Sequence, residues 1–152
     1  MRGALPAIGI TGLVAGTLDI CSAFIHAATR GASPTRVLQF VASGLLGRRS
    51  FEGGPTTAAL GLGLHFVIAF GATTVFYLAS RRLPILHSRP IISGLVFGIG
   101  VWLFMNLIVV PLSAAIPRHS PSSDLIQLGI HMFVIGLIIS LLVRRFSSAP
   151  QT

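Results

Sequence analysis

The run from Leu5 to Ala28 constrains the fold of this chain more than any other stretch. It contains no arginine or lysine, and it is long enough to cross the ~30 Å hydrocarbon core of a bilayer as an α-helix. Asp19 lies near its middle. Because a carboxylate at the centre of a spanning helix costs roughly 2.5–3.5 kcal/mol, Asp19 should face protein or water rather than lipid. The run therefore predicts a transmembrane helix with one polar side.

The composition also indicates a membrane protein. Of the 152 residues, 53% are hydrophobic and only 9% are charged, well below the charged share of soluble domains. The net charge of +8 does not predict a nucleic-acid partner, because the arginines cluster beside the apolar runs and form no basic face. Such arginines are typical of residues that orient helices and contact lipid headgroups. The lipid bilayer is therefore the first predicted partner.

Three further apolar runs are long enough to cross a membrane. Together the four runs predict transmembrane helices over about residues 5–28, 56–80, 90–116 and 123–143. A shorter run over residues 34–46 follows Ser33-Pro34, a typical helix start, and is too short to cross. Its apolar residues recur on one face, at Val37, Leu38, Val41 and Leu45. We therefore predict a single all-α transmembrane domain over residues 1–152, with four spanning helices and one amphipathic helix in the membrane interface.

Two short matches indicate an internal repeat. Residues 10–16 (ITGLVAG) resemble residues 92–98 (ISGLVFG), and LGLH at 62–65 resembles LGIH at 128–131. The two offsets differ by about the length of the amphipathic segment, which only the first half contains. We predict two pseudo-repeated helical hairpins, related by an axis along the membrane normal. Coincidence is the alternative, because membrane sequences draw on few residue types.

Arginines indicate the orientation of the helices. Six of them lie on the side of the two termini and five on the other side. Arg81-Arg82 and Arg144-Arg145 end the second and fourth predicted helices. These two pairs favour a cytoplasmic location for both termini.

Four strong hydrogen-bonding side chains, one from each predicted helix, fall at a common depth. They are Asp19, His65, Asn106 and His131. Each lies about eight to ten residues, or ~12–15 Å, from the face that carries the longest loop, close to the bilayer midplane. The polarity continues toward that face at Ser22, His26, Gln127 and Asp124. We predict a midplane polar layer that opens into a polar vestibule, with the helix at residues 34–46 covering it as a lid.

Several short motifs resemble those of a known group of proteins. They are His65-Phe66, the Arg-Arg-Leu-Pro at residues 81–84, and Met105-Asn106 followed by Pro111-Leu112. The chain is similar in these motifs to an uncharacterised family of small four-helix bacterial inner-membrane proteins, which are loosely YagU-like. The resemblance covers the second and third helices. It implies a bacterial inner-membrane location and a link to acid resistance, and it assigns no catalytic residue.

The leading hypothesis is a polar layer that binds or relays protons or a small polar ligand, without a bound cofactor. Asp19 would be the ionisable centre, the two central histidines can titrate near neutral pH, and His26 would exchange protons with the loop face. No enzymatic activity is predicted, because the sequence contains no glycine-rich phosphate loop, metalloprotease histidine pair or CxxC motif.

Three alternatives stay open at this point. The polar layer could be only a hydrogen-bonded cluster that fixes helix register. His65 and His131 could instead be the axial ligands of one b-type haem, or could hold a divalent metal together with Asp19. The chain could also be a structural accessory subunit, in which case a homo-oligomer or a partner membrane complex would explain the polar layer.

Overall fold

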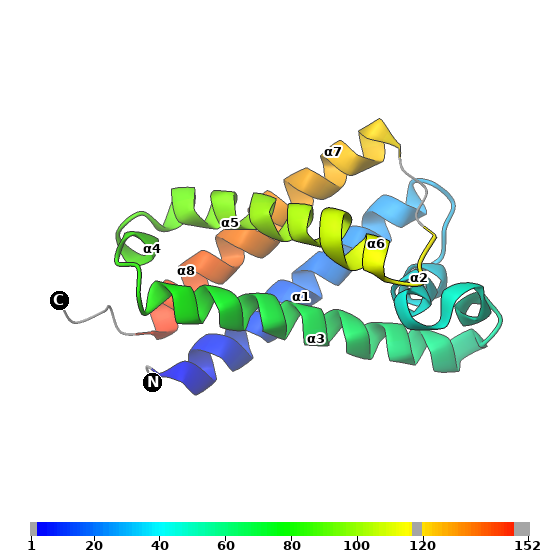
Figure 1. The fold of residues 1–152 in the computed structure, drawn as a ribbon, viewed down its shortest axis with the longest axis horizontal. Helices are drawn as coiled ribbons and strands as arrows, with labels where there is room; N and C mark the ends of the chain where they lie inside the picture. The colour runs from blue at the N-terminus through cyan, green and yellow to red at the C-terminus, as the bar shows by residue number, and fades with distance from the viewer. Residues whose placement is uncertain (1–2, 117–119, 148–152) are drawn as a thin grey trace.

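The computed structural model describes residues 3–116 and 120–147, and every regular element within them is a helix (Figure 1). Four helical segments are long and apolar enough to cross a membrane. They are α1 (Ala4–Ala28), α3 (Gly54–Ser80), the segment Pro90–Leu112 and the segment Pro121–Phe146. The four predicted helices of spanning length are therefore confirmed.

Two of the four segments contain a π-helical turn, where the helical pitch changes. Pro90–Leu112 is composed of α5 (Pro90–Phe104), the π-helical turn η2 (Met105–Val109) and α6 (Val110–Leu112). Pro121–Phe146 is composed of α7 (Pro121–Ile130), the π-helical turn η3 (His131–Gly136) and α8 (Leu137–Phe146). Pro111 accounts for η2, because its ring crowds the carbonyl four residues earlier and has no N–H to donate, so the preceding turn widens.

The third spanning segment ends earlier than predicted, at Leu112 rather than near residue 116. Ser113 leaves the helix with φ −94° and ψ 171°. The next amide, that of Ala114, donates to the carbonyl of Gly44 at 3.0 Å. The backbone after α6 is therefore held by a contact distant in sequence, which periodicity alone does not reveal.

The short helix α2 (Pro34–Leu46) begins as predicted, because the Arg36 amide donates to the Ser33 hydroxyl at 3.2 Å. Its predicted apolar face is half-buried at Val37, Leu38 and Val41, and its burial against lipid or the bundle stays a prediction. The side chains buried on α2 are Gln39, Ala42 and Ser43, while Leu45 is 65% exposed. The Gln39 amide donates to the Gly54 carbonyl at 3.2 Å. A polar contact to the start of α3 therefore helps to hold α2 in place.

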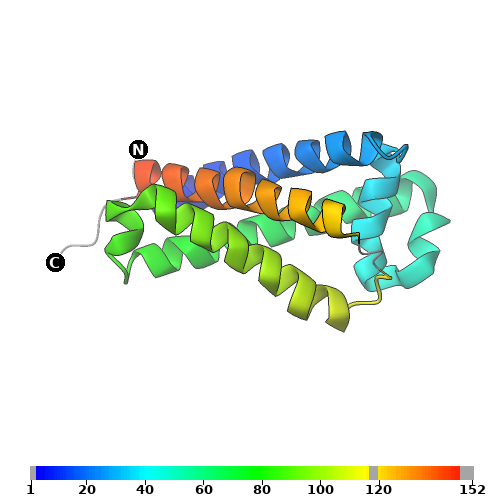
Figure 2. The same ribbon diagram turned by 90° about the horizontal axis from the view of Figure 1, so that it is seen from above.

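The helices form an elongated bundle with both described ends of the chain on one side (Figures 1 and 2). The Gly3 amide donates to the Phe146 carbonyl at 2.9 Å, so the starts and ends of the bundle are joined there. α1 packs against both α3 and α8, and α5 packs against η3 and α8. At the far end lie α2 and the 3-10 turn η1 (Gly47–Phe51), and at the near end α4 (Ile85–Ser88) joins α3 to α5.

The apolar core occupies the half of the bundle nearer the termini. Its largest fully buried side chains are Phe76 of α3 and Ile139 and Val143 of α8. The rings of Phe76 and Phe97 meet edge to face, with centroids 5.0 Å apart. Two cavities lie toward the α2 end, away from this half, which is filled by side chains.

Candidate functional site

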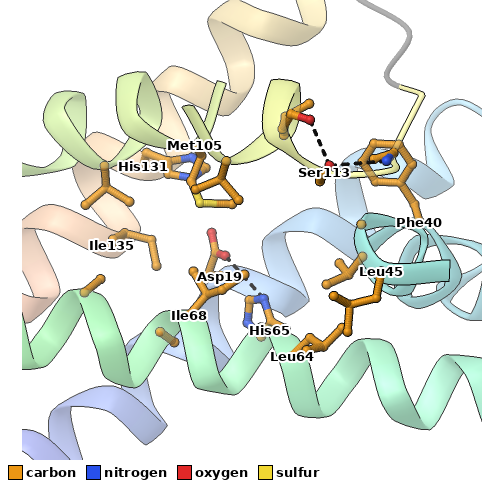
Figure 3. Close-up of a pocket in the computed structure, with 18 residues that line it drawn as sticks. Asp19, Phe40, Leu45, Leu64, His65, Ile68, Met105, Ser113, His131 and Ile135 are labelled. Carbon is orange, nitrogen blue, oxygen red and sulfur yellow. Dashed lines mark hydrogen bonds and ion pairs between the residues drawn. The ribbon is translucent and has the colours of Figure 1, made fainter. Parts of the chain in front are cut away.

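A pocket of about 300 Å³ lies between α3 and the α5–α6 segment (Figure 3). Three ionisable side chains line it, Asp19 of α1, His65 of α3 and His131 of η3. Most of its other walls are apolar, and α2 closes one side with Phe40, Val41, Gly44 and Leu45. We call this cavity the inner pocket. It gathers three of the four predicted polar-layer residues.

The Asp19 carboxylate and the His65 ring face each other within the inner pocket. The Asp19 Oδ2 and the His65 Nδ1 lie 4.0 Å apart, and the side chains are only 17% and 12% exposed. The other ring nitrogen of His65, Nε2, lies 2.8 Å from the carbonyl oxygen of Gly16. The histidine of α3 is therefore fixed between two groups of α1.

The hydrogen bond to Gly16 determines which nitrogen of His65 carries a hydrogen. A carbonyl oxygen only accepts, so Nε2 must donate. In a neutral imidazole the second nitrogen, Nδ1, then has a bare lone pair, and this lone pair faces the Asp19 carboxylate. Two acceptors opposed in a low-dielectric site repel each other, and one added proton turns the repulsion into attraction. The pair therefore has a place for one proton.

His131 presents a second basic nitrogen to the same cavity. Its Nδ1 donates to the Gln127 carbonyl at 2.8 Å, one turn earlier in the same helix. By the same argument the neutral ring keeps its lone pair on Nε2. In Figure 3 the Asp19 carboxylate lies between His131 and His65. Asp19 and the two histidines therefore offer the inner pocket acceptors, which suits a proton or a ligand with N–H or O–H donors.

Asn106 is not among the residues that line the inner pocket. Its side-chain amide donates to the Trp102 carbonyl at 2.9 Å, four residues earlier in the same segment. This bond satisfies the amide locally, within the stretch where α5 passes into η2. The prediction that Asn106 joins the other three side chains is corrected here.

The predicted vestibule corresponds in part to a second cavity of about 670 Å³, which we call the outer pocket. His26 and Gln127 line it, and His26 Nε2 lies 3.0 Å from the Ser123 hydroxyl oxygen. Ser22 and Asp124 do not line it, and the Ser22 hydroxyl donates to the Leu18 carbonyl of its own helix at 2.8 Å. Phe40 borders both pockets, so α2 separates the outer from the inner one.

Sequence reasoning missed the basic lining of the outer pocket. Arg30, Arg36 and Arg48 all border it. Their positions before, within and after α2 were a usable signal, because a short helix between two turns can bring its flanking residues together.

The inner pocket does not fit the haem and metal alternatives as it is arranged. Among residues 3–116 and 120–147, no three His, Cys, Asp or Glu side chains are placed to hold a metal ion. His65 directs Nε2 to a carbonyl oxygen, which leaves only Nδ1, on the side of Asp19, with a lone pair for a metal. A bonded N–H cannot also coordinate a metal.

Comparisons of the chain with protein-family models, with curated proteins and with solved structures find no match. The resemblance to the YagU-like group therefore stays a prediction.

Proposed function

We propose that this chain is a multi-pass membrane protein whose inner pocket binds a proton at the Asp19–His65 pair and exchanges it with the face that carries α2. One observation carries the proposal. His65 donates through Nε2 to the Gly16 carbonyl and turns Nδ1 toward the Asp19 carboxylate at 4.0 Å. A buried acid and a bare basic nitrogen held this close by separate helices need a shared proton to be stable.

The protein's own groups suggest a route for that proton. From the pair, the nearest further base in the pocket is the Nε2 of His131. Beyond α2, His26 and its partner Ser123 border the outer pocket, with Phe40 between the two cavities. The half of the bundle nearer the termini is filled by Phe76, Ile139 and Val143. This arrangement supports proton exchange from one side only.

The same acceptors can bind a small polar ligand in place of the free proton. A ligand with N–H or O–H donors would bond to Asp19 and to the bare nitrogens of the histidines, while the apolar walls would exclude water. Protonation of the Asp19–His65 pair would then remove acceptors from the pocket. Ligand binding and proton binding would therefore compete.

We also propose the finer points of the architecture. Two pseudo-repeated hairpins are supported by the glycines: Gly12 and Gly16 of α1 face α3, and Gly94 and Gly98 of α5 face the π turn and α8. The arginine pairs at the ends of α3 and α8 support cytoplasmic termini in a bacterial inner membrane. In that frame α2 lies at the opposite interface, and the resemblance to YagU-like proteins suggests a role under acid stress.

Infrared difference spectroscopy between pH 8 and pH 5 tests the proton site in the reconstituted protein. We expect a carboxyl stretching band that is lost in Asp19→Asn and altered in His65→Gln. Asn106→Leu is the matched control, because its amide bonds within its own helix and leaves the pocket unchanged. The proposal is wrong if the folded Asp19→Asn variant keeps the band, or if His65→Gln leaves the band unchanged.

A further inference from the structure

The outer pocket carries a second and independent inference, because its charge is opposite to that of the inner pocket. Arg30 follows α1, Arg36 lies in the first turn of α2 and Arg48 lies in η1. All three line the same cavity, and none of its described lining residues is an aspartate or a glutamate. Three basic side chains therefore border this cavity, and no carboxylate among the described residues lines it.

The three arginines are available to a ligand. None of them is within ion-pair distance of a carboxylate in the part of the chain that the structure describes. The guanidinium of Arg36 lies over the ring of Phe51, 4.2 Å from its centroid, and this contact holds its planar donors in one place. Like charges gathered in one cavity repel, so an anion that enters relieves the repulsion.

The walls of the outer pocket indicate what the anion is attached to. Val37, Phe40, Phe51 and Ile116 give it apolar surface beside the arginines. The cavity lies where α1 ends and α2 begins, at one end of the spanning helices, which is the level of lipid headgroups. Arginine binds phosphate oxygens through paired N–H donors.

We propose that the outer pocket binds the phosphate group of an anionic phospholipid, with Arg30, Arg36 and Arg48 on the phosphate and the apolar wall against the start of the acyl chains. The shared chemistry is that of a phosphate anion, and the source could also be free phosphate. Arg36 is the residue expected to contribute most, because Phe51 already orders it.

Binding to the purified full chain in a neutral detergent tests the proposal. The probes are dioctanoyl phosphatidylglycerol, dioctanoyl phosphatidylcholine and inorganic phosphate, and the readouts are bound lipid by native mass spectrometry and the Tm shift. We expect saturable binding of one phosphatidylglycerol per chain and much weaker binding of phosphatidylcholine, whose ammonium opposes the arginines. Arg36→Gln combined with Arg48→Gln should weaken phosphatidylglycerol binding by about 25-fold, from roughly five-fold per arginine.

The matched control is Arg82→Gln combined with Arg89→Gln, which removes the same charge at the opposite end of the bundle and should bind as the unmodified chain does. In the absence of lipid, both double variants should have the same Tm as the unmodified chain, since all four replaced side chains are exposed. Equal loss in both pairs, or equal binding of the two lipids, would overturn the proposal. Competition by inorganic phosphate at the same concentration as the lipid would overturn the lipid as the source and assign the site to the free anion. None of these results depends on Asp19, so the proposal of a proton site at Asp19 and His65 is tested independently of the lipid site.

Discussion

The two helical hairpins of the bundle, α1 with α3 and α5 with η3 and α8, both pack closely at glycines, but against different kinds of atoms. In the first, a side chain added at Gly12 or Gly16 of α1 would meet side chains of α3, chiefly Phe70 and Phe66. In the second, a side chain added at Gly98 of α5 would meet the backbone at His131 and Met132. Side chains can move aside and backbone cannot, so the second hairpin is the more rigid wall.

The two histidines follow the same division. His65 bonds across the first hairpin to the Gly16 carbonyl of α1, whereas His131 bonds to Gln127 of its own helix. The histidines of the two similar tetrapeptides, LGLH at 62–65 and LGIH at 128–131, therefore make different contacts. The first hairpin, α1 with α3, holds the Asp19–His65 pair. The second hairpin presents one further base, His131, to the same pocket.

The largest expected effect is that of Gly98→Ala. The new methyl would lie 2.6 Å from the Met132 Cα and even closer to the His131 carbonyl, so the helices must separate. We expect the free energy of unfolding to fall by about 3 kcal/mol, the upper part of the range for overpacking. Denaturation in mixed detergent micelles measures it.

Two matched substitutions sharpen this result. Gly100→Ala, on the same helix with open space around it, should be neutral or stabilising by up to about 1 kcal/mol. Gly12→Ala should cost less than Gly98→Ala, because only the Phe70 ring has to move. A larger loss for Gly12→Ala than for Gly98→Ala would refute the contrast between the hairpins.

The next effect separates the two histidines. His65→Leu removes a bond between helices and leaves the Asp19 carboxylate without its partner, so we expect a loss of about 2 kcal/mol. His131→Leu removes a bond within one helix and should cost only about 0.5 kcal/mol, the low end of the range for a hydrogen bond. Denaturation in mixed detergent micelles measures both losses. Equal losses of unfolding free energy in the two variants would mean that His65 does not join α1 to α3.

A smaller effect of opposite sign is expected in α1. Thr11 is fully buried, and its hydroxyl oxygen has no hydrogen-bond partner within the described residues. Thr11→Val should therefore stabilise the protein by about 1 kcal/mol. Thr73 is equally buried but donates to the Ala69 carbonyl at 2.9 Å, so Thr73→Val is the control and should not stabilise.

The smallest effect concerns the turn that joins the hairpins. Burial, then Arg144 and Arg81, lower the pKa of His87 in α4. At high pH the folded and unfolded chains both carry a neutral ring. As the pH falls below about 6.5, the unfolded chain binds a proton that the folded chain does not, so stability declines. Melting curves at pH 7.5 and pH 5.5 should show a smaller decline in His87→Gln than in the unmodified chain, and an equal decline would contradict this assignment.

The sequence predicted what local pattern determines and missed what neighbours determine. The four apolar spans and the Ser33 start of α2 follow from composition and capping. Asp19 and His65 could be paired because an acid in a span needs a partner at its own depth. Whether a side chain turns inward or bonds to its own helix depends on the rotation of that helix. Sequence periodicity does not give this rotation, so the predicted position of Asn106 in the polar layer was wrong.

The missed features have a common cause. Gln39 is buried because the Gly54 carbonyl lies opposite it, a contact between α2 and the start of α3. The arginines of the outer pocket converge because a turn follows α1 and η1 follows α2. Such contacts depend on the path of the chain between helices, and the periodicity of the sequence does not predict them.

The central claim is that His65 keeps a hydrogen on Nε2 and shares a proton with Asp19 through Nδ1. Nitrogen-15 NMR of the full chain labelled at histidine, in lipid bicelles, tests this most directly, with His65→Gln to assign the signals. We predict a protonated Nε2 at every pH and a Nδ1 signal that changes with pH and whose titration is altered in Asp19→Asn. A neutral His65 with its hydrogen on Nδ1 and a bare Nε2, or a titration that Asp19→Asn leaves untouched, would contradict the account.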